Sequence, residues 1–259
     1  MATDPASTQS SFKDHFSTIA DAYAQARPEY PDALFDAIAA VVPAHASVWE
    51  PGCGSGQATR GLAARFAHVH ATEPSAKQLA QHWAQGTHGN VTLAVEPGER
   101  TTLEDGSVQL VAVAQALHWF DREPFFRECQ RVLTPGGVLA AWGYGDFIAP
   151  EGMIDAVEAF RSRIEPYWPP ERAQIDARYA GYDWPFPALP APELWLEVEW
   201  SLGQFLRYLS SMSAVARCTA DTGEDPVARH GPALAAAWGG EGDTRQIQWP
   251  LFLHLRRKP

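Results

Sequence analysis

The chain of 259 residues is long enough for one large α/β domain with an elaboration, or for two small domains. Hydrophobic residues make up 46% of it and charged residues 20%, an ordinary globular balance with ample core. The net charge of −11 and the lack of a basic run in the sequence argue against a nucleic-acid partner, because an acidic chain repels phosphate. No apolar run approaches the length that spans a bilayer, so no membrane partner is expected.

The cysteines are three in number and far apart in the sequence: Cys53, Cys129 and Cys218. They form neither a metal-binding spacing nor a disulfide framework, so we expect no metal. The first eighteen residues contain charged side chains and no apolar core of a signal peptide. A reducing, cytoplasmic setting is the expectation that follows.

In chain order, a polar N-terminal stretch leads into residues 12–27, which look helical. The Pro-Glu-Tyr-Pro sequence at 28–31 then breaks the chain before a predicted helix from Asp32 to Val42. We therefore predict an N-terminal arm or cap over residues 1–30 and a core over residues 31–145.

Residues 48–57 read V-W-E-P-G-C-G-S-G-Q, and they are the most informative part of the sequence. An apolar pair leads into Glu50, and a helix-compatible stretch follows at 57–66. Between them, glycines occupy alternate positions: Gly52, Gly54 and Gly56. Glycine permits positive φ and lets a ligand approach the backbone without meeting a Cβ atom. A strand, a glycine turn and a helix start together build a nucleotide-type site at the carboxyl edge of a parallel sheet.

The spacing of these glycines distinguishes between two kinds of cofactor. A dinucleotide-binding turn has the pattern G-x-G-x-x-G, which places a pyrophosphate on a helix N-terminus. Here the pattern is G-x-G-x-G, with a carboxylate two residues before the first glycine. That carboxylate suits a ligand with a positive end, such as the amino group of a methionine moiety. The alternative is a glycine-rich surface turn without a ligand.

The next polar group expected at this edge is Glu73, which ends a strand-like run at 68–73. It stands seventeen residues after Gly56, where an acidic side chain can accept hydrogen bonds from ribose hydroxyls. A solvated loop carboxylate is the alternative. Ser75 is a plausible N-cap of a helix that continues through Trp83.

The segment at 48–57 closely resembles motif I of the class I S-adenosylmethionine (SAM) methyltransferases, whose pattern is E/D-x-G-x-G-x-G. An apolar run at 108–113 and the sequence R-V-L-T-P-G-G-V-L-A-A-W at 131–142 resemble the family's fourth and fifth strands. One departure is Gln109, where the family usually has Asp. The resemblance implies an α/β, Rossmann-like sheet of seven mixed strands in the order 3-2-1-4-5-7-6. Its last strand would be antiparallel, and helices would cover both faces.

The same resemblance implies a site for SAM, with S-adenosylhomocysteine as product. The string Y-A-Q-A-R-P-E-Y-P at 23–31 resembles an arm that covers bound SAM in one branch of the family. Packing of its tyrosine and solvation of its arginine are the alternative. The implied cofactor-binding residues are Tyr23, Arg27, Glu50, Gly52, Cys53, Gly54, Gly56, Glu73, Pro74, Gly98, Glu99 and Gln115.

Beyond residue 143 the pattern changes. After a predicted helix at 151–164, prolines and aromatics become dense, and we predict an acceptor lid over 146–193. Residues 194–259 would complete the core sheet, starting with a strand at 194–200. Helices are predicted at 204–213 and 226–238. A final strand is predicted at 246–257, which Pro250 would confine to an edge or a bulge.

Within the family, A-Q-A-L-H-W-F-D at 114–121 and F-L-R-Y-L-S-S-M-S at 205–213 resemble a small-molecule branch that includes trans-aconitate methyltransferases. This implies a small-molecule acceptor, with a carboxylic acid as one candidate. A carboxylate needs no base, whereas a hydroxyl or amine would need one, and His118 is then the catalytic candidate. The candidate acceptor contacts, each of which could instead be a core or solvated residue, are His118, Trp119, Tyr144, Trp168, Tyr182 and Arg207.

Two other functions stay open at this point. One is a SAM-binding regulatory protein without catalysis, and the other is a nicotinamide-dependent oxidoreductase on a similar sheet. The glycine spacing argues against the second. The oligomeric state is left open.

Overall fold

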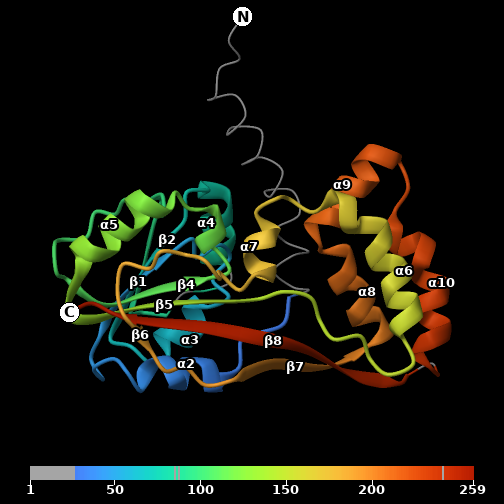
Figure 1. Ribbon diagram of the computed structural model, residues 1–259, viewed down its shortest axis with the longest axis horizontal. Coiled ribbons are helices and arrows are strands. Elements are labelled where there is room, and N and C mark those ends of the chain that lie inside the picture. Colours follow the sequence, from blue (N-terminus) through green and yellow to red (C-terminus); the bar gives the residue numbers. More distant parts are fainter. Residues whose placement is uncertain (1–26, 85, 87, 241) are drawn as a thin grey trace, which may run out of the picture.

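The computed structural model describes residues 27–84, 86, 88–240 and 242–259 (Figure 1). An eight-stranded sheet forms its centre, in the order β3-β2-β1-β4-β5-β8-β6, with β7 paired to β8 beside this path. The predicted helix at 12–27 and Tyr23 lie outside the described residues. The predicted mixed, Rossmann-like α/β sheet is confirmed, and its order matches the prediction when β8 is taken as the seventh strand and β7 as the sixth. The short β6 is one strand more than the seven predicted.

Five parallel strands make the half of the sheet that carries the glycine turn. They are β1 (Ser47–Pro51), β2 (His68–Thr72), β3 (Val91–Ala94), β4 (Val108–Ala114) and β5 (Leu133–Tyr144). Both faces of β1 are buried, because Val48 packs in one core cluster and Trp49 in the other. Such a strand reads as an apolar run rather than an alternating one. The first strand ends next to Glu50, as predicted.

Helices cover both faces of this half. Helices α2 (Asp32–Ala39) and α3 (Thr59–Ala63) lie on one face, and α5 (Arg122–Val132) lies on the other (Figure 1). Helix α4 (Ala76–Ala84) follows β2. The Ser75 hydroxyl accepts a hydrogen bond from the Gln78 amide at 3.3 Å, which confirms the predicted N-cap.

Strand β8 (Thr244–Arg257) is long and pairs with different strands along its length. Its first half pairs with β7 (Leu194–Ser201), and its second half pairs with β5 and with the short β6 (Ala188–Leu189), all antiparallel. The prediction that Pro250 confines this strand to an edge or a bulge is wrong for the strand as a whole, because β8 lies between β5 and β6. Pro250 pairs with Trp195 on one side, and the ladder to β5 begins only at Leu251. The missing N–H therefore falls where the strand changes partners.

The rest of the chain forms a helical group at one end of the sheet, beside β7 (Figure 1). It contains α6 (Ile154–Ile164), α8 (Leu202–Ser210), α9 (Ser213–Thr222) and α10 (Pro226–Trp238). The 146–193 segment also holds a short 3-10 turn, η2 (Glu165–Tyr167), and α7 (Arg172–Asp176). A lid role for this segment stays a prediction. The described part of the chain has no helix long and apolar enough to cross a membrane.

Helix α8 begins earlier than the predicted residue 204 because of a capping box. The Ser201 side chain accepts from the Gln204 amide, and the Gln204 side chain accepts from the Ser201 amide at 2.9 Å. Two backbone donors at the helix start are satisfied in this way.

Replacing Ser201 by Ala should therefore lower the free energy of unfolding by ~0.5–2 kcal/mol. Urea denaturation would measure it. The matched control is Ser210→Ala on the exposed last turn of α8, where only a bond to the Leu206 carbonyl is lost. An equal effect of both substitutions would contradict the capping role.

Candidate active site

Polar side chains from several strands meet at the carboxyl edge of the sheet. Glu50 belongs to β1, Glu73 follows β2, Gln115 follows β4, and Tyr144 ends β5. Because these strands are parallel, their ends share one edge, which is where open α/β sheets bind ligands.

The glycine turn needs its glycines for different reasons. All three have positive φ: 69° at Gly52, 54° at Gly54 and 86° at Gly56. A Cβ atom at Gly52 would lie 2.8 Å from the Ala116 Cβ, so that glycine is required by packing. At Gly54 the nearest atom to such a Cβ is the Gln78 Oε1 at 3.4 Å. Space beside the backbone is therefore left open at the middle glycine.

Glu50 is buried to 1% exposure, and neither of its carboxylate oxygens has a hydrogen-bond partner among the described residues. Burial raises its pKa to about 8. The charge of Arg60 and the nearby Thr59 hydroxyl, which does not reach hydrogen-bond geometry with Glu50, lower it only in part. A buried carboxylate without partners is costly. A ligand that supplies a positive charge with N–H donors would remove that cost.

Glu73 lies at the next strand end and is only 7% exposed, so the solvated-loop alternative is wrong. One of its oxygens accepts from the Gly54 amide at 3.1 Å, and the other accepts from the Ser75 amide at 3.0 Å. The carboxylate thus ties β2 to the middle of the glycine turn. Each oxygen has a second lone pair with which it can accept from a ligand hydroxyl. Pro74 lies between Glu73 and Ser75, whose hydrogen bond fixes this turn.

The loop after β3 holds Gly98 and Glu99. A Cβ at Gly98 would lie 2.6 Å from the Phe120 ring, and a Cβ at Gly52 would lie 3.1 Å from the same ring. Phe120 therefore packs between the two glycine-bearing loops, and sequence reasoning missed it although the H-W-F-D string contains it. The Glu99 carboxylate accepts from the Asp121 amide at 2.9 Å, so it binds the N-terminus of α5.

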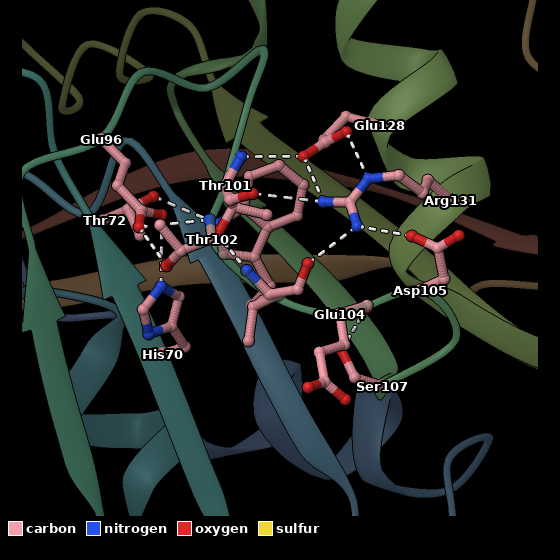
Figure 2. A network of polar contacts seen from close by, with 12 residues as sticks. His70, Thr72, Glu96, Thr101, Thr102, Glu104, Asp105, Ser107, Glu128 and Arg131 are labelled. Atoms are coloured by element: carbon pink, nitrogen blue, oxygen red, sulfur yellow. Dashed lines mark hydrogen bonds and ion pairs between the residues drawn. The ribbon is translucent and has the colours of Figure 1, made fainter.

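A polar network behind this loop fixes its position (Figure 2). Buried Glu96 accepts from His70 Nε2 at 3.2 Å and from the Thr102 hydroxyl at 2.5 Å. Burial alone would raise the pKa of Glu96, but the hydrogen bonds from Thr101, Thr102 and His70 outweigh it and lower the pKa. Farther along, Arg131 pairs with Glu128 and Asp105, and it donates to the Leu103 carbonyl at 2.8 Å. The loop is thus held from both β2 and α5.

Cys53 lies inside the turn, with its Sγ 3.6 Å from His82 Nδ1. Burial raises the pKa of Cys53, and the charges of Glu50 and Glu73 act in the same direction. The thiol therefore stays protonated and does not suit a nucleophilic role.

His82 packs against the same turn. Burial lowers the pKa of His82 to about 4, with the charge of Arg60 adding to the effect. A Cβ at Gly56 would lie 2.2 Å from the His82 ring, so His82 packs directly against the turn. Sequence reasoning missed this contact.

Gln115 is a non-glycine residue with positive φ, at 51°. Its side-chain amide donates to the Tyr144 carbonyl at 2.8 Å, and its backbone amide donates to the Trp142 carbonyl at 3.0 Å. It therefore ties the end of β4 to the end of β5. Non-glycine residues in this region of φ are strained and gather at functional sites.

His118 lies in the short 3-10 turn η1 (Leu117–Trp119), just past β4. Its Nδ1 is 3.3 Å from the hydroxyl of Tyr179, and its ring centroid is 4.7 Å from that of Trp119, which is 39% exposed. Burial lowers the pKa of His118 to about 4, and the charge of Arg172 adds to this. The imidazole is therefore neutral near pH 7.

Of the other predicted acceptor contacts, Tyr182 lies near His118 through Tyr179, and the rest lie in different surroundings. Trp168 packs under the Arg172 guanidinium, whose carbon is 4.1 Å from the ring centroid. Tyr182 donates to Gln174. The buried ring of Tyr144 packs edge-on against Tyr30 and Trp249, and Arg207 is exposed on α8.

In the arm, the Arg27 guanidinium lies over the ring of Tyr208, 5.3 Å from its centroid. The described residues hold no group of three or more His, Cys, Asp or Glu side chains that could bind a metal.

Comparisons with known proteins find methyltransferases for the part of the chain that carries the glycine turn. Residues 49–141 match the methyltransferase-domain family. A Dictyostelium discoideum protein, named as a candidate methyltransferase, is 30% identical over 268 aligned positions and 99% of both chains. A Saccharomyces cerevisiae protein, whose name describes an S-adenosylmethionine-dependent methyltransferase, is 28% identical over 56% of this chain and 51% of its own.

The solved structures include a candidate type II methyltransferase from Anaeromyxobacter dehalogenans. It is 40% identical, with a TM-score of 0.82 over 89% of this chain and 97% of its own. The likeness therefore extends well beyond the glycine turn.

The unpaired carboxyl of Glu50 should make stability depend on pH. Its pKa is about 8 in the folded protein, and the ordinary pKa of a glutamate side chain is 4.5, so between these values the folded state binds one more proton than the unfolded state. The contribution of Glu50 to the free energy of unfolding is fully present below pH 4.5. It is lost as the pH rises toward 8, by up to ~1.4 kcal/mol per pH unit. In the Glu50→Gln protein this pH dependence of the free energy of unfolding should be absent, because glutamine does not titrate.

Urea denaturation of both proteins at several pH values would measure the difference. Other titrating groups are common to the two proteins and cancel in the comparison. Parallel stability curves between pH 5 and 8 would contradict the buried, unpaired state of Glu50.

Proposed function

Because the chain belongs to the class I SAM-dependent methyltransferase family, we propose that it transfers a methyl group from SAM to a small-molecule acceptor. The observation that carries this proposal is Glu50, a buried carboxylate with no partner in the described part of the chain, beside an open glycine turn. It fits the amino group of a methionine moiety. When bound, SAM supplies an already electrophilic methyl group on a sulfonium.

The residues at the sheet edge fit the parts of such a cofactor. Glu50 would accept hydrogen bonds from the amino group, and the backbone of the turn would lie along the ligand beside Gly54. Glu73 would accept from the ribose hydroxyls while it holds the Gly54 amide. The adenine would lie near the loop of Gly98 and Glu99, where Phe120 packs against Gly98 and Glu99 holds the start of α5.

The chain's own residues would then orient the acceptor and exclude water. Collinear alignment of the acceptor atom, methyl carbon and sulfur is a positioning task that can lower a barrier by ~7–11 kcal/mol. The net charge of −11 supports a small molecule over a nucleic acid. The clustering of Trp119, Tyr179 and Tyr182 near His118 supports an aromatic wall for a compact acceptor.

Binding of SAM without catalysis is the second candidate, and nicotinamide chemistry is the third. The strained Gln115 and the half-buried His118 at the strand end favour a catalytic site over a purely regulatory one, because strain gathers where chemistry needs it. The spacing of the glycines disfavours a dinucleotide.

Replacing Gly54 by Val should abolish SAM binding, because a side chain would fill the open space beside the turn. The substitution is also strained at a φ of 54°. Glu73→Ala should weaken SAM binding by ~1–3 kcal/mol, the scale of a lost hydrogen bond to a charged group. Isothermal calorimetry measures both effects. Gly106→Val is a control at a glycine with similar φ of 58° on another loop, and it should bind normally.

A screen of SAM consumption against small acids, phenols and amines, read by mass spectrometry, tests the acceptor. We expect one of these small molecules to gain a methyl group. Efficient methylation of a folded protein or an oligonucleotide, with no small acceptor consumed, would contradict the proposal. Unchanged SAM affinity in both binding-site variants would contradict the cofactor site.

A further inference from the structure

The environment of His118 determines which of its two ring nitrogens carries the proton. Nδ1 faces the Tyr179 hydroxyl at 3.3 Å. Nε2 has no hydrogen-bond partner within the described ranges, and the side chain is half-buried at the edge of the sheet. One nitrogen is therefore committed to the protein, and the other is left for a ligand.

Tyr179 is held in place by its surroundings. It is 1% exposed, and its ring packs edge-on against Phe252 at 5.2 Å and beside Tyr182 at 5.0 Å, centroid to centroid. Arg178 and Tyr179 are consecutive non-glycine residues with positive φ, at 50° and 55°. The Arg178 carbonyl accepts from His254 Nε2 at 2.8 Å. The fold thus maintains a strained turn that presents the Tyr179 hydroxyl to His118.

The hydroxyl of Tyr179 is buried with the rest of the side chain, and Nδ1 of His118 is its one hydrogen-bond partner among the described residues. Burial raises the pKa of Tyr179, so the hydroxyl keeps its proton near pH 7. A buried hydroxyl proton needs an acceptor. The acceptor within reach is Nδ1 of His118. A neutral imidazole that accepts at Nδ1 carries its proton on Nε2.

We propose that Tyr179 holds His118 in the Nε2–H tautomer, so that His118 donates a hydrogen bond to a carboxylate acceptor instead of removing a proton from a hydroxyl or amine. This inference rests on the proposed methyl transfer. Tyr179 is a positioning residue in it, and His118 is the residue that touches the acceptor.

The chemistry of a carboxylate matches such a donor. One carboxylate oxygen forms a bond to the methyl carbon while the carbon–sulfur bond breaks, and its electron pair stays on sulfur. The negative charge of the acceptor and the positive charge of the sulfonium cancel, which leaves a methyl ester and a neutral thioether. No proton moves, so no base is required. The Nε2–H group can hold the second oxygen throughout. It keeps its proton because the N–H of a neutral imidazole is a much weaker acid than a carboxylic acid.

Nitrogen-15 NMR of the full chain, labelled at histidine, measures the tautomer directly. The signal of His118 among the nine histidines is assigned by its loss in His118→Gln. In the wild-type protein near pH 7, we expect an unprotonated Nδ1 and a protonated Nε2. In Tyr179→Phe, we expect the signals to move toward a mixture of tautomers. Tyr182→Phe, which removes a neighbouring hydroxyl bonded to Gln174, is the control and should keep the wild-type tautomer.

A proton on Nδ1 in the wild-type protein would overturn the proposal. This measurement needs neither SAM nor turnover, so it is independent of the proposed function.

Kinetics of two His118 variants separate a donor from a base. A glutamine side chain can donate near the Nε2 position but cannot take up a proton. With a carboxylic acid as acceptor, His118→Ala should lower kcat/KM by roughly 10- to 100-fold, the scale of a lost hydrogen bond to a charged group. His118→Gln should recover most of that loss.

Equal losses in His118→Gln and His118→Ala, while both variants bind SAM like the wild type, would overturn the donor role. Methylation of phenols or amines without any acid would overturn the acceptor class and leave the methyltransferase function standing. No SAM consumption with any small molecule would instead refute the proposed function, and the donor role with it.

Discussion

The buried carboxylate of Glu50 is the constraint on which the rest of the site depends. Folding removes this group from water at the end of β1 and gives it no hydrogen bond from the described residues. Parallel ladders to β2 and β4 on both sides of β1 keep the strand, and so the carboxylate, from moving toward solvent. Below pH 8 a proton offsets much of that cost, and a ligand that brings positive charge and N–H donors would offset it with the carboxylate ionised. The fold of β1 therefore holds Glu50 ready for a cationic group.

Much of the cofactor half could be predicted from the sequence, because its determinants are local. Strand β1, the glycine turn and Glu73 follow from an apolar run, three glycines and a carboxylate at a set distance. Helix α10 spans 226–238 as predicted, since Asp225 caps it and Pro226 stands at its first position. The sheet order followed from resemblance to a family, and the structure confirms it.

The remaining parts depend on contacts between residues far apart in sequence, which no local pattern encodes. Tyr179 meets His118 across 61 positions, and nothing in the sequence near either residue indicates the other. Phe120 fills the gap between the two glycine-bearing loops only once β1 and β3 stand in one sheet. The sequence predicts an edge or a bulge at Pro250, because proline lacks the N–H that a second neighbouring strand would need. Strand β8 changes partners midway, so the proline is accommodated in a strand that lies inside the sheet.

The two halves of the site are therefore built by different means. The cofactor side uses backbone conformation at glycines, where positive φ is inexpensive. The proposed acceptor side uses side chains held by strain, because Gln115, Arg178 and Tyr179 are the non-glycine residues with positive φ in the described part of the chain. Gln115 ties β4 to β5, and Tyr179 orients His118, so both act on the same strand end. Strain of ~1–3 kcal/mol per residue persists only where the surrounding packing fixes it. A change of acceptor would then require new side chains around η1 and α7, while the glycine turn and its cofactor stayed unchanged.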